Sequence, residues 1–180
     1  MKLMDQSPGG AVRSVLPTAL LSVFDAGRDS IESVQARARS TFTAAKFIVW
    51  EGDPATFAFS YVGADAESLL GYPAADWIES PGFWVDHVVH PDDRREALAC
   101  RALATGRGRD QLFEYRALRS DGGIAWMLDY VNVVRGGRGV PSRLRGIMFD
   151  ITAAKQRAGL PQALPGLREP SQEQLEQVIE

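Results

Sequence analysis

The sequence is poor in the residues that catalysis, metal binding and disulfide formation require. Its 180 residues include one cysteine, Cys100, and two histidines, His87 and His90. A single cysteine cannot form a disulfide within the chain, which fits a reducing compartment. Neither histidine belongs to a nucleophile motif such as Gly-x-Ser-x-Gly, and a nucleophile needs a neighbouring base. We therefore expect no enzymatic activity in this chain.

The chain also lacks an excess of positive charge and a long apolar run. Its formal net charge is −3, so no broad basic surface is available to neutralise the phosphates of a nucleic acid. The apolar run at residues 15–24 is interrupted by Pro17 and Ser22 and is shorter than the ~18 residues that span a bilayer. The same segment has a thin basic region and a poor cleavage site for a signal peptide. The sequence thus predicts a cytoplasmic protein without nucleic-acid or membrane partners.

Two candidate chemical sites have simpler structural interpretations. His87 and His90 stand three residues apart, a spacing that can place two metal ligands on one helical face. However, residues 90–93 read His-Pro-Asp-Asp, with proline and acidic residues placed as in a first helical turn, so we expect no metal. Cys100 lies among alanine and leucine residues, where a buried, inert thiol is expected.

What the sequence does contain is a periodic pattern of short strands and helices. Alternating apolar residues bounded by Gly-, Pro- and Asp-rich turns predict five strands, at residues 47–50, 56–62, 111–119, 124–135 and 142–151. Helices are predicted between the second and third strands, at residues 66–70, 73–78 and 91–105. Two more are predicted before the first strand, at residues 17–26 and 29–45. Strands on either side of a helical group predict an α+β fold with one antiparallel sheet.

These elements divide the chain into four parts. The parts are a loose tail (1–14), N-terminal flanking helices (15–45), one domain (46–157) and a linker followed by the start of a further helix (158–180). The linker contains Pro161, Pro165 and Pro170. Because proline inside a helix costs ~3 kcal/mol, no continuous helix can leave the domain. A new helix is predicted to begin at Ser171, which has the spacing of a capping box with Gln174.

The predicted helix at residues 29–45 has a heptad seam and a capping-box spacing between Asp29 and Glu32. The seam consists of Ile31, Val34, Ala38, Thr41 and Ala45, with Phe42 beside it, and Ile31, Val34, Ala38 and Phe42 are the residues expected to contact a second subunit. A seam this short can pack on a second subunit or on the sheet of its own domain, and the pattern leaves both interpretations open.

The strand predicted at residues 124–135 is apolar on both faces, with Asp129 as the one polar residue on its face of Ala125 and Met127. A strand buried on both faces needs cover on each side, from the N-terminal helix or from a second subunit. Together with the heptad seam, this pattern leads us to expect a homodimer.

Six stretches of the sequence form a recognisable series when taken in order. They are Ile48 to Asp53, Leu69 to Tyr72, Phe83 to Arg94, Phe113 to Arg116, Asp121-Gly122 followed by Trp126, and Gly146 to Thr152. Together these stretches resemble the PAS family. The resemblance implies a PAS fold with a five-stranded antiparallel sheet and a small pocket enclosed by the helices between the second and third strands. It also implies a non-catalytic sensory, regulatory and dimerisation module of bacterial signal transduction. PAS domains of this kind usually precede a histidine kinase or diguanylate cyclase, which would be its partner.

From the resemblance we expect a pocket for an unknown small ligand, lined by residues near Leu70, Trp84, Leu98 and Met127. No cofactor is expected. The photoreactive Asn-Cys-Arg-Phe context of flavin photosensors is absent, and residues 91–105 contain no histidine to ligate haem. A flavin or haem sensor of light or gas is the alternative that we weigh against ligand sensing.

The resemblance places the joint between sensor and output at Asp150 and Thr152. The local sequence supports this role, because residues 152–157 are good helix formers. An aspartate before such a helix can accept a hydrogen bond from the backbone N–H of residue 152 or 153 and fix the angle at which the chain leaves the sheet.

Overall fold

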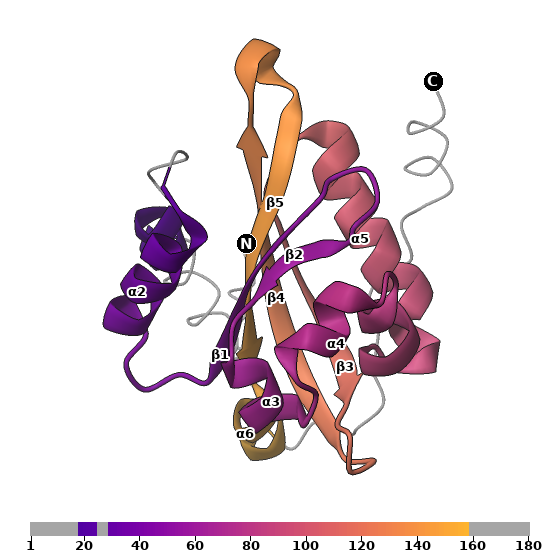
Figure 1. The fold of residues 1–180 in the computed structure, drawn as a ribbon. Coiled ribbons are helices and arrows are strands. Elements are labelled where there is room, and N and C mark those ends of the chain that lie inside the picture. The colour runs from indigo at the N-terminus through magenta and orange to yellow at the C-terminus, as the bar shows by residue number, and fades with distance from the viewer. Residues whose placement is uncertain (1–17, 25–28, 159–180) are drawn as a thin grey trace, which may run out of the picture.

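The computed structural model describes residues 18–24 and 29–158. At its centre is a five-stranded antiparallel sheet in the order β2-β1-β5-β4-β3 (Figure 1). The strands are β1 (Phe47–Gly52), β2 (Phe59–Val62), β3 (Gln111–Leu118), β4 (Ile124–Arg135) and β5 (Pro141–Asp150). The α+β class and the single antiparallel sheet predicted from the sequence are confirmed.

Helices lie on both faces of this sheet (Figure 1). Between β2 and β3 come α3 (Asp65–Leu70), α4 (Ala74–Glu79), a π-helical turn (Trp84–Val88), a 3-10 turn (Pro91–Asp93) and α5 (Arg94–Arg107). The opposite face is covered by a helix at residues 18–24 and by α2 (Ile31–Thr41). A 3-10 turn (Gly137–Gly139) joins β4 to β5, and α6 (Thr152–Arg157) follows β5.

The sheet separates two clusters of buried side chains. The inner cluster lies between the sheet and α3 to α5, and Met127 of β4 belongs to it. The outer cluster lies between the sheet and the N-terminal helices, and Leu128, the next residue of β4, belongs to that one. Both faces of β4 are therefore buried as predicted, and helices of the same chain provide the cover.

The heptad seam of α2 packs on the chain's own sheet. Ile31, Val34 and Ala38 are buried in the outer cluster. Phe42, directly after the helix, packs edge-on against Phe149 with 5.0 Å between ring centroids. Of the two interpretations left open by the sequence, the structure shows the seam packed on the sheet of its own domain. The domain buries Ile31, Val34 and Ala38 and half-buries Phe42, and the assignment of these residues to a dimer helix stays a prediction.

Several element boundaries differ from the prediction by one to four residues, and two of these differences have clear local reasons. The sequence predicted Asp29 as the N-cap of helix α2, but the N-cap is Ser30, which accepts a hydrogen bond from the backbone N–H of Ser33. The Asp29 carboxylate instead forms an ion pair with Arg37. Strand β2 begins at Phe59 because the Asp53 carboxylate accepts from two backbone N–H groups of the preceding turn. The predicted tail, the proline-containing linker and the helix from Ser171 lie outside the described residues.

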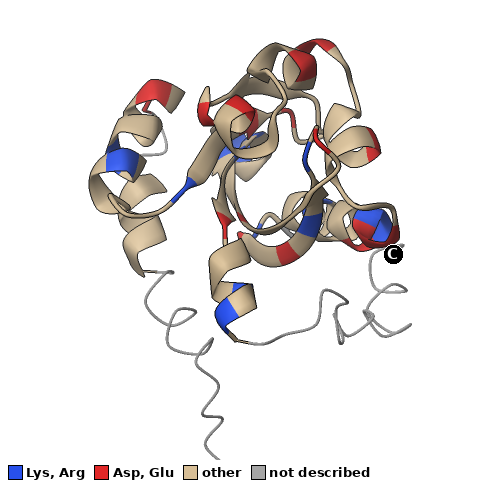
Figure 2. Cartoon of the chain, turned by 90° about the horizontal axis from the view of Figure 1, so that it is seen from below, with Lys and Arg blue, Asp and Glu red and all other residues tan. Residues whose placement is uncertain are grey.

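Charged residues of both signs are interspersed over the fold (Figure 2). Among the described helices, none combines the length and apolar character needed to cross a bilayer.

Candidate functional site

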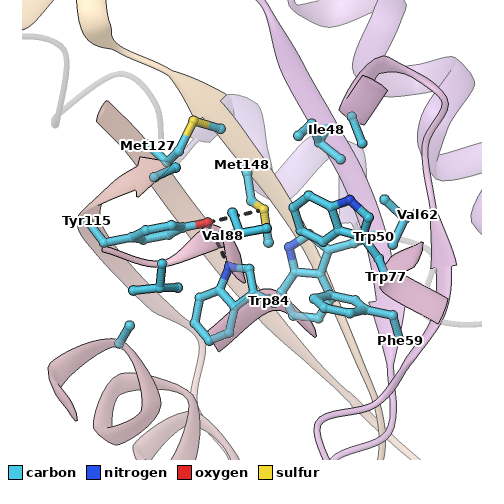
Figure 3. Close-up of a cluster of buried hydrophobic side chains, with 14 of the residues drawn as sticks. Ile48, Trp50, Phe59, Val62, Trp77, Trp84, Val88, Tyr115, Met127 and Met148 are labelled. Atoms are coloured by element: carbon cyan, nitrogen blue, oxygen red, sulfur yellow. Dashed lines mark hydrogen bonds between the residues drawn. The ribbon is translucent and has the colours of Figure 1, made fainter. Parts of the chain in front are cut away.

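The interior beneath α5 contains a buried arginine surrounded by aromatic rings. Arg101 is 1% exposed, and it lies on the face of α5 that also buries Ala97 and Ala104. The central carbon of its guanidinium is 3.5 Å from the centroid of the Trp84 ring, 4.5 Å from that of Trp50 and 5.0 Å from that of Phe59. We call these three rings, which Figure 3 shows together in the core, the aromatic cage.

A buried carboxylate completes the cage. Asp129 of β4 is 0% exposed, and it accepts hydrogen bonds from Trp50 Nε1 at 3.0 Å and from a terminal nitrogen of Arg101 at 3.4 Å. Trp50 reaches this carboxylate because it pairs with Gly146 across β1 and β5. The indole lies where any side chain at position 146 would stand.

The buried charges are only partly satisfied. Burial raises the pKa of Asp129 to about 6, although the Arg101 charge and the Trp50 hydrogen bond act in the opposite direction. Burial also lowers the pKa of Arg101, against the influence of Asp129. The 3.4 Å bond is long for a charge-assisted hydrogen bond. Arg101 Nε, moreover, has no hydrogen-bond partner among the described residues.

A second buried chain of hydrogen bonds links the cage to β5. Trp84 Nε1 donates to the Tyr115 hydroxyl at 3.0 Å, and this hydroxyl donates to Met148 Sδ at 3.3 Å (Figure 3). Burial raises the pKa of Tyr115, so its hydroxyl keeps its proton. The cage is therefore connected to the sheet by directed polar contacts as well as by packing.

The end of β5 carries a second constellation of polar groups. Asp150 Oδ1 accepts from the backbone N–H of Thr152 at 2.9 Å, the capping contact expected from the sequence. Asp150 Oδ2 forms an ion pair with Arg119 at 3.1 Å, and Thr152 Oγ1 accepts from the backbone N–H of Trp126 at 2.9 Å. Arg119 also donates to the carbonyl of Leu69. These contacts, which we call the exit joint, tie the start of α6 to β3, β4 and α3.

Comparison with known proteins identifies the family. A family model described as "PAS fold" matches residues 59–148, which span half of the chain. The chain belongs to the PAS fold family. No curated protein sequence matches it.

Solved structures agree with this assignment. The N-terminal domain of a diguanylate cyclase with a PAS/PAC sensor from Marinobacter aquaeolei is 37% identical, with a TM-score of 0.56 over 61% of this chain and 98% of that one. A sensory box histidine kinase/response regulator from Burkholderia thailandensis is 25% identical, with a TM-score of 0.54 over 78% of this chain and 98% of that one. A PAS domain from Colwellia psychrerythraea shares the fold at 22% identity, with a TM-score of 0.53 over 69% of this chain and 99% of that one.

Three of the four predicted pocket residues lie in the interior of this PAS domain. Leu70, Trp84 and Met127 are buried in the inner cluster. Leu98 is 37% exposed, so its placement in the pocket is wrong. It follows Ala97 directly, and successive residues of an α-helix point about 100° apart, so the inward face of α5 belongs to Ala97, Arg101 and Ala104.

The sequence reasoning missed Arg101 as the partner of Asp129. One signal was available, because an aspartate alone on an otherwise apolar strand face needs a buried partner. The arginine lies 28 residues earlier, on a helix whose alanines do not define an inner face.

His90 and Cys100 of this PAS domain occupy positions that serve the fold rather than a chemical step. His90 caps the 3-10 turn by accepting from the backbone N–H of Asp92 at 3.3 Å. Asp93 holds Arg116 of β3 through an ion pair of 2.6 Å. In the part of the chain that the structure describes, no cluster of three or more His, Cys, Asp or Glu residues could hold a metal ion. Burial raises the pKa of the Cys100 thiol to about 11, so it is a poor nucleophile at neutral pH.

A surface groove of about 490 Å³ adjoins the exit joint rather than the cage. It lies between the end of α2, the start of β1 and α3, and its lining includes Arg39, Phe42, Lys46 and Leu69. The carbonyl of Lys46 accepts from the backbone N–H of Asp150 at 2.9 Å, and that of Leu69 accepts from Arg119. Two residues of the groove lining are therefore hydrogen-bonded to Asp150 and Arg119 of the exit joint.

Proposed function

We propose that this PAS domain is a non-catalytic sensory and regulatory module of a cytoplasmic bacterial signalling protein. Its input is the aromatic cage with Asp129, and its output is the exit joint at Asp150 and Thr152. The similarity to the sensor domains of a diguanylate cyclase and a histidine kinase supports an effector of one of these classes.

The observation that carries this proposal is the buried pair of Arg101 and Asp129. A buried ion pair is weak evidence for stability, because well-packed apolar residues in its place are often equally or more stable. Buried groups with displaced pKa values are, by contrast, typical of functional sites. Because the Arg101 Nε donor has no partner among the described residues and the bond from Arg101 to Asp129 is long, a ligand that offers better contacts can rearrange this pair.

The sheet provides a short path from the pair to the exit joint. Asp129 pairs with Met148 across β4 and β5, and Met127 pairs with Asp150 in the same register. A shift of Asp129 along β4 therefore also moves Met127, which pairs with Asp150 of the exit joint. Met148 also receives the hydrogen bond from Tyr115, so the cage acts on β5 at the same point.

A sensor that carries flavin or haem remains the alternative function. The residues of the interior fit neither cofactor, because Arg101, Trp50 and Trp84 fill the space beneath α5. In addition, α5 contains no histidine, and the thiol of Cys100 has a raised pKa. These features favour a small ligand over a large planar cofactor.

We also propose self-association, through a surface other than the seam of α2. Leu21, on the helix of residues 18–24, is 59% exposed. A contiguous exposed apolar patch marks an interaction surface, whereas a single exposed leucine is ordinary for a monomer, so Leu21 is a position at which to test this proposal and the mass in solution decides it.

Hydrogen exchange in the exit segment tests the sensory proposal. Arg101→Met removes the charge and keeps a long side chain in the cage, and we expect altered protection of amides 152–157. Leu98→Ala on the exposed face of the same helix is the matched control and should leave these amides unchanged. If Arg101→Met changes protection only around α5, the cage does not communicate with the exit joint and the proposed path is wrong.

A further inference from the structure

We propose that the aromatic cage and Asp129 form a binding site for a small organic cation, and that the guanidinium of Arg101 is a resident occupant that such a ligand displaces. This inference rests on the proposed sensory function and names the class of its ligand. The ligand would carry a single positive charge on a methylated ammonium or an alkylguanidinium group.

The geometry of the site is that of a cation receptor. Three rings surround the guanidinium at 3.5 to 5.0 Å from their centroids, within the ~6 Å over which a cation is attracted to a ring face. The Asp129 carboxylate supplies the counter-charge from the sheet side. Recognition of ammonium groups is a known use of such cages, and here a side chain of the protein itself occupies the position of the ligand.

Arg101 fits this receptor imperfectly. It makes one long hydrogen bond to Asp129, and its buried Nε donor has no partner among the described residues. A buried donor without an acceptor costs about 1–3 kcal/mol. A quaternary ammonium group has no N–H and would leave no such donor unpaired, while the displaced guanidinium would regain its hydration.

Displacement of Arg101 would also free α5. Apart from Arg101, the fully buried side chains of this helix are Ala97 and Ala104, which contribute little apolar area. Arg101 is thus the one large side chain of α5 that is fully buried among the described residues. Its departure would loosen the helix from β4, which connects ligand binding to the response proposed above.

The first experiment opens the site. Arg101→Ala removes the resident cation, and calorimetry with methylguanidinium should show saturable binding to this variant. Methylurea, a neutral compound of similar shape, should bind at least about tenfold more weakly, a difference of about 1.4 kcal/mol. The double variant Arg101→Ala with Asp129→Asn should bind methylguanidinium about tenfold more weakly than Arg101→Ala does. Equal binding of the charged and neutral probes would show that the cage does not select cations and would overturn the proposal.

The second experiment asks whether a ligand displaces Arg101 in the unmodified protein, and it does not depend on the folding of any variant. Tetramethylammonium and methylguanidinium are titrated while the Nε–H resonance of Arg101, assigned with Arg101→Lys, is followed by NMR. Saturable loss or displacement of this resonance is expected, with no effect of neopentyl alcohol, a neutral and water-soluble analogue of tetramethylammonium that carries an added hydroxyl group. An unchanged resonance at saturating probe would mean that Arg101 is a fixed part of the core.

These outcomes separate the inference from the sensory proposal. If cations do not bind but Arg101→Met still alters exchange at amides 152–157, the sensory proposal stands and the ligand class is wrong. If cations displace Arg101 while those amides remain unchanged, the site exists but does not reach the exit joint.

Discussion

Trp50 and Gly146 face each other across β1 and β5, and the indole of Trp50 occupies the space that a side chain at position 146 would need. This close approach allows Trp50 Nε1 to reach Asp129 and places the ring beside Arg101. The glycine is therefore a condition for the cage, although it contributes no atom to it.

Gly146→Ala should destabilise the domain by about 1–3 kcal/mol, the usual cost of overpacking a core. The added methyl group collides with Cε2, Nε1 and Cζ2 of the Trp50 indole, which is held by its contact with Phe59 and its hydrogen bond to Asp129 and cannot move aside freely. Urea denaturation followed by tryptophan fluorescence measures the change. Gly137→Ala, where an added methyl group meets no atom within 4 Å, is the control and should be nearly neutral. Equal midpoints for both variants would show that Trp50 adapts without cost.

Asp129 should make stability depend on pH in a direction opposite to that of most carboxylates. Its pKa is raised from 3.8 to about 6 in the folded state, so between these values the folded state binds more protons than the unfolded one. Stability supplied by this group therefore decreases as the pH rises from about 4 to about 6. Asp129→Asn cannot titrate and should lack this decrease.

Urea midpoints at pH 4, 5, 6 and 7 for wild type and Asp129→Asn provide the measurement. The difference between the two proteins is the relevant quantity, because other carboxylates such as Asp93, whose pKa is lowered in spite of its burial by hydrogen bonds from Arg116, contribute the opposite slope to both. Parallel curves would mean that Asp129 remains ionised throughout this range.

The sequence predicted the bounds of β4 but not the orientation of α5, for a physical reason. The bounds of β4 were predicted to the residue, because its run of strand-forming residues is bounded by glycine-rich turns on both sides. Helix α5 has an Ala-rich inner face, and alanine fits inside or outside a core, so the pattern left its orientation ambiguous. Leu98 was consequently placed inside in preference to Arg101, whose burial depends on Asp129 and on rings from β1, β2 and the π-helical turn.

In the exit joint, the sequence predicted the local contact but not the long-range one, for a similar reason. The capping contact of Asp150 with Thr152 is local, and the sequence shows both partners. Arg119 is 31 residues away from Asp150, and only the fold reveals that it joins the same carboxylate.

Substitutions in the two N-terminal helices should separate folding from association. Val34 is completely buried against the sheet, so Val34→Asp places an unpaired charge in the outer cluster and should destabilise the domain by several kcal/mol. Leu21→Asp changes an exposed position and should leave the free energy of unfolding within about 0.5 kcal/mol. Light scattering should show a reduced mass for Leu21→Asp if this helix face joins two subunits. A mass that is monomeric in wild type at tens of micromolar protein would contradict self-association altogether.

Asp150→Ala should loosen the exit segment while the domain remains folded. The substitution removes the acceptor for the backbone N–H of Thr152 and the ion pair with Arg119. Loss of the cap costs ~1 kcal/mol and loss of a partly exposed ion pair up to about 1 kcal/mol, which is small beside the roughly 5–15 kcal/mol that stabilise a domain. Hydrogen exchange should therefore become faster at amides 152–157, and at the ends of the strands only slightly. Glu79→Ala, an exposed change at the end of α4, is the control and should leave the segment unaffected. If protection of amides 152–157 is the same in Asp150→Ala and wild type, Trp126 and Thr152 hold the start of α6 without the carboxylate, and the output role assigned to Asp150 is wrong.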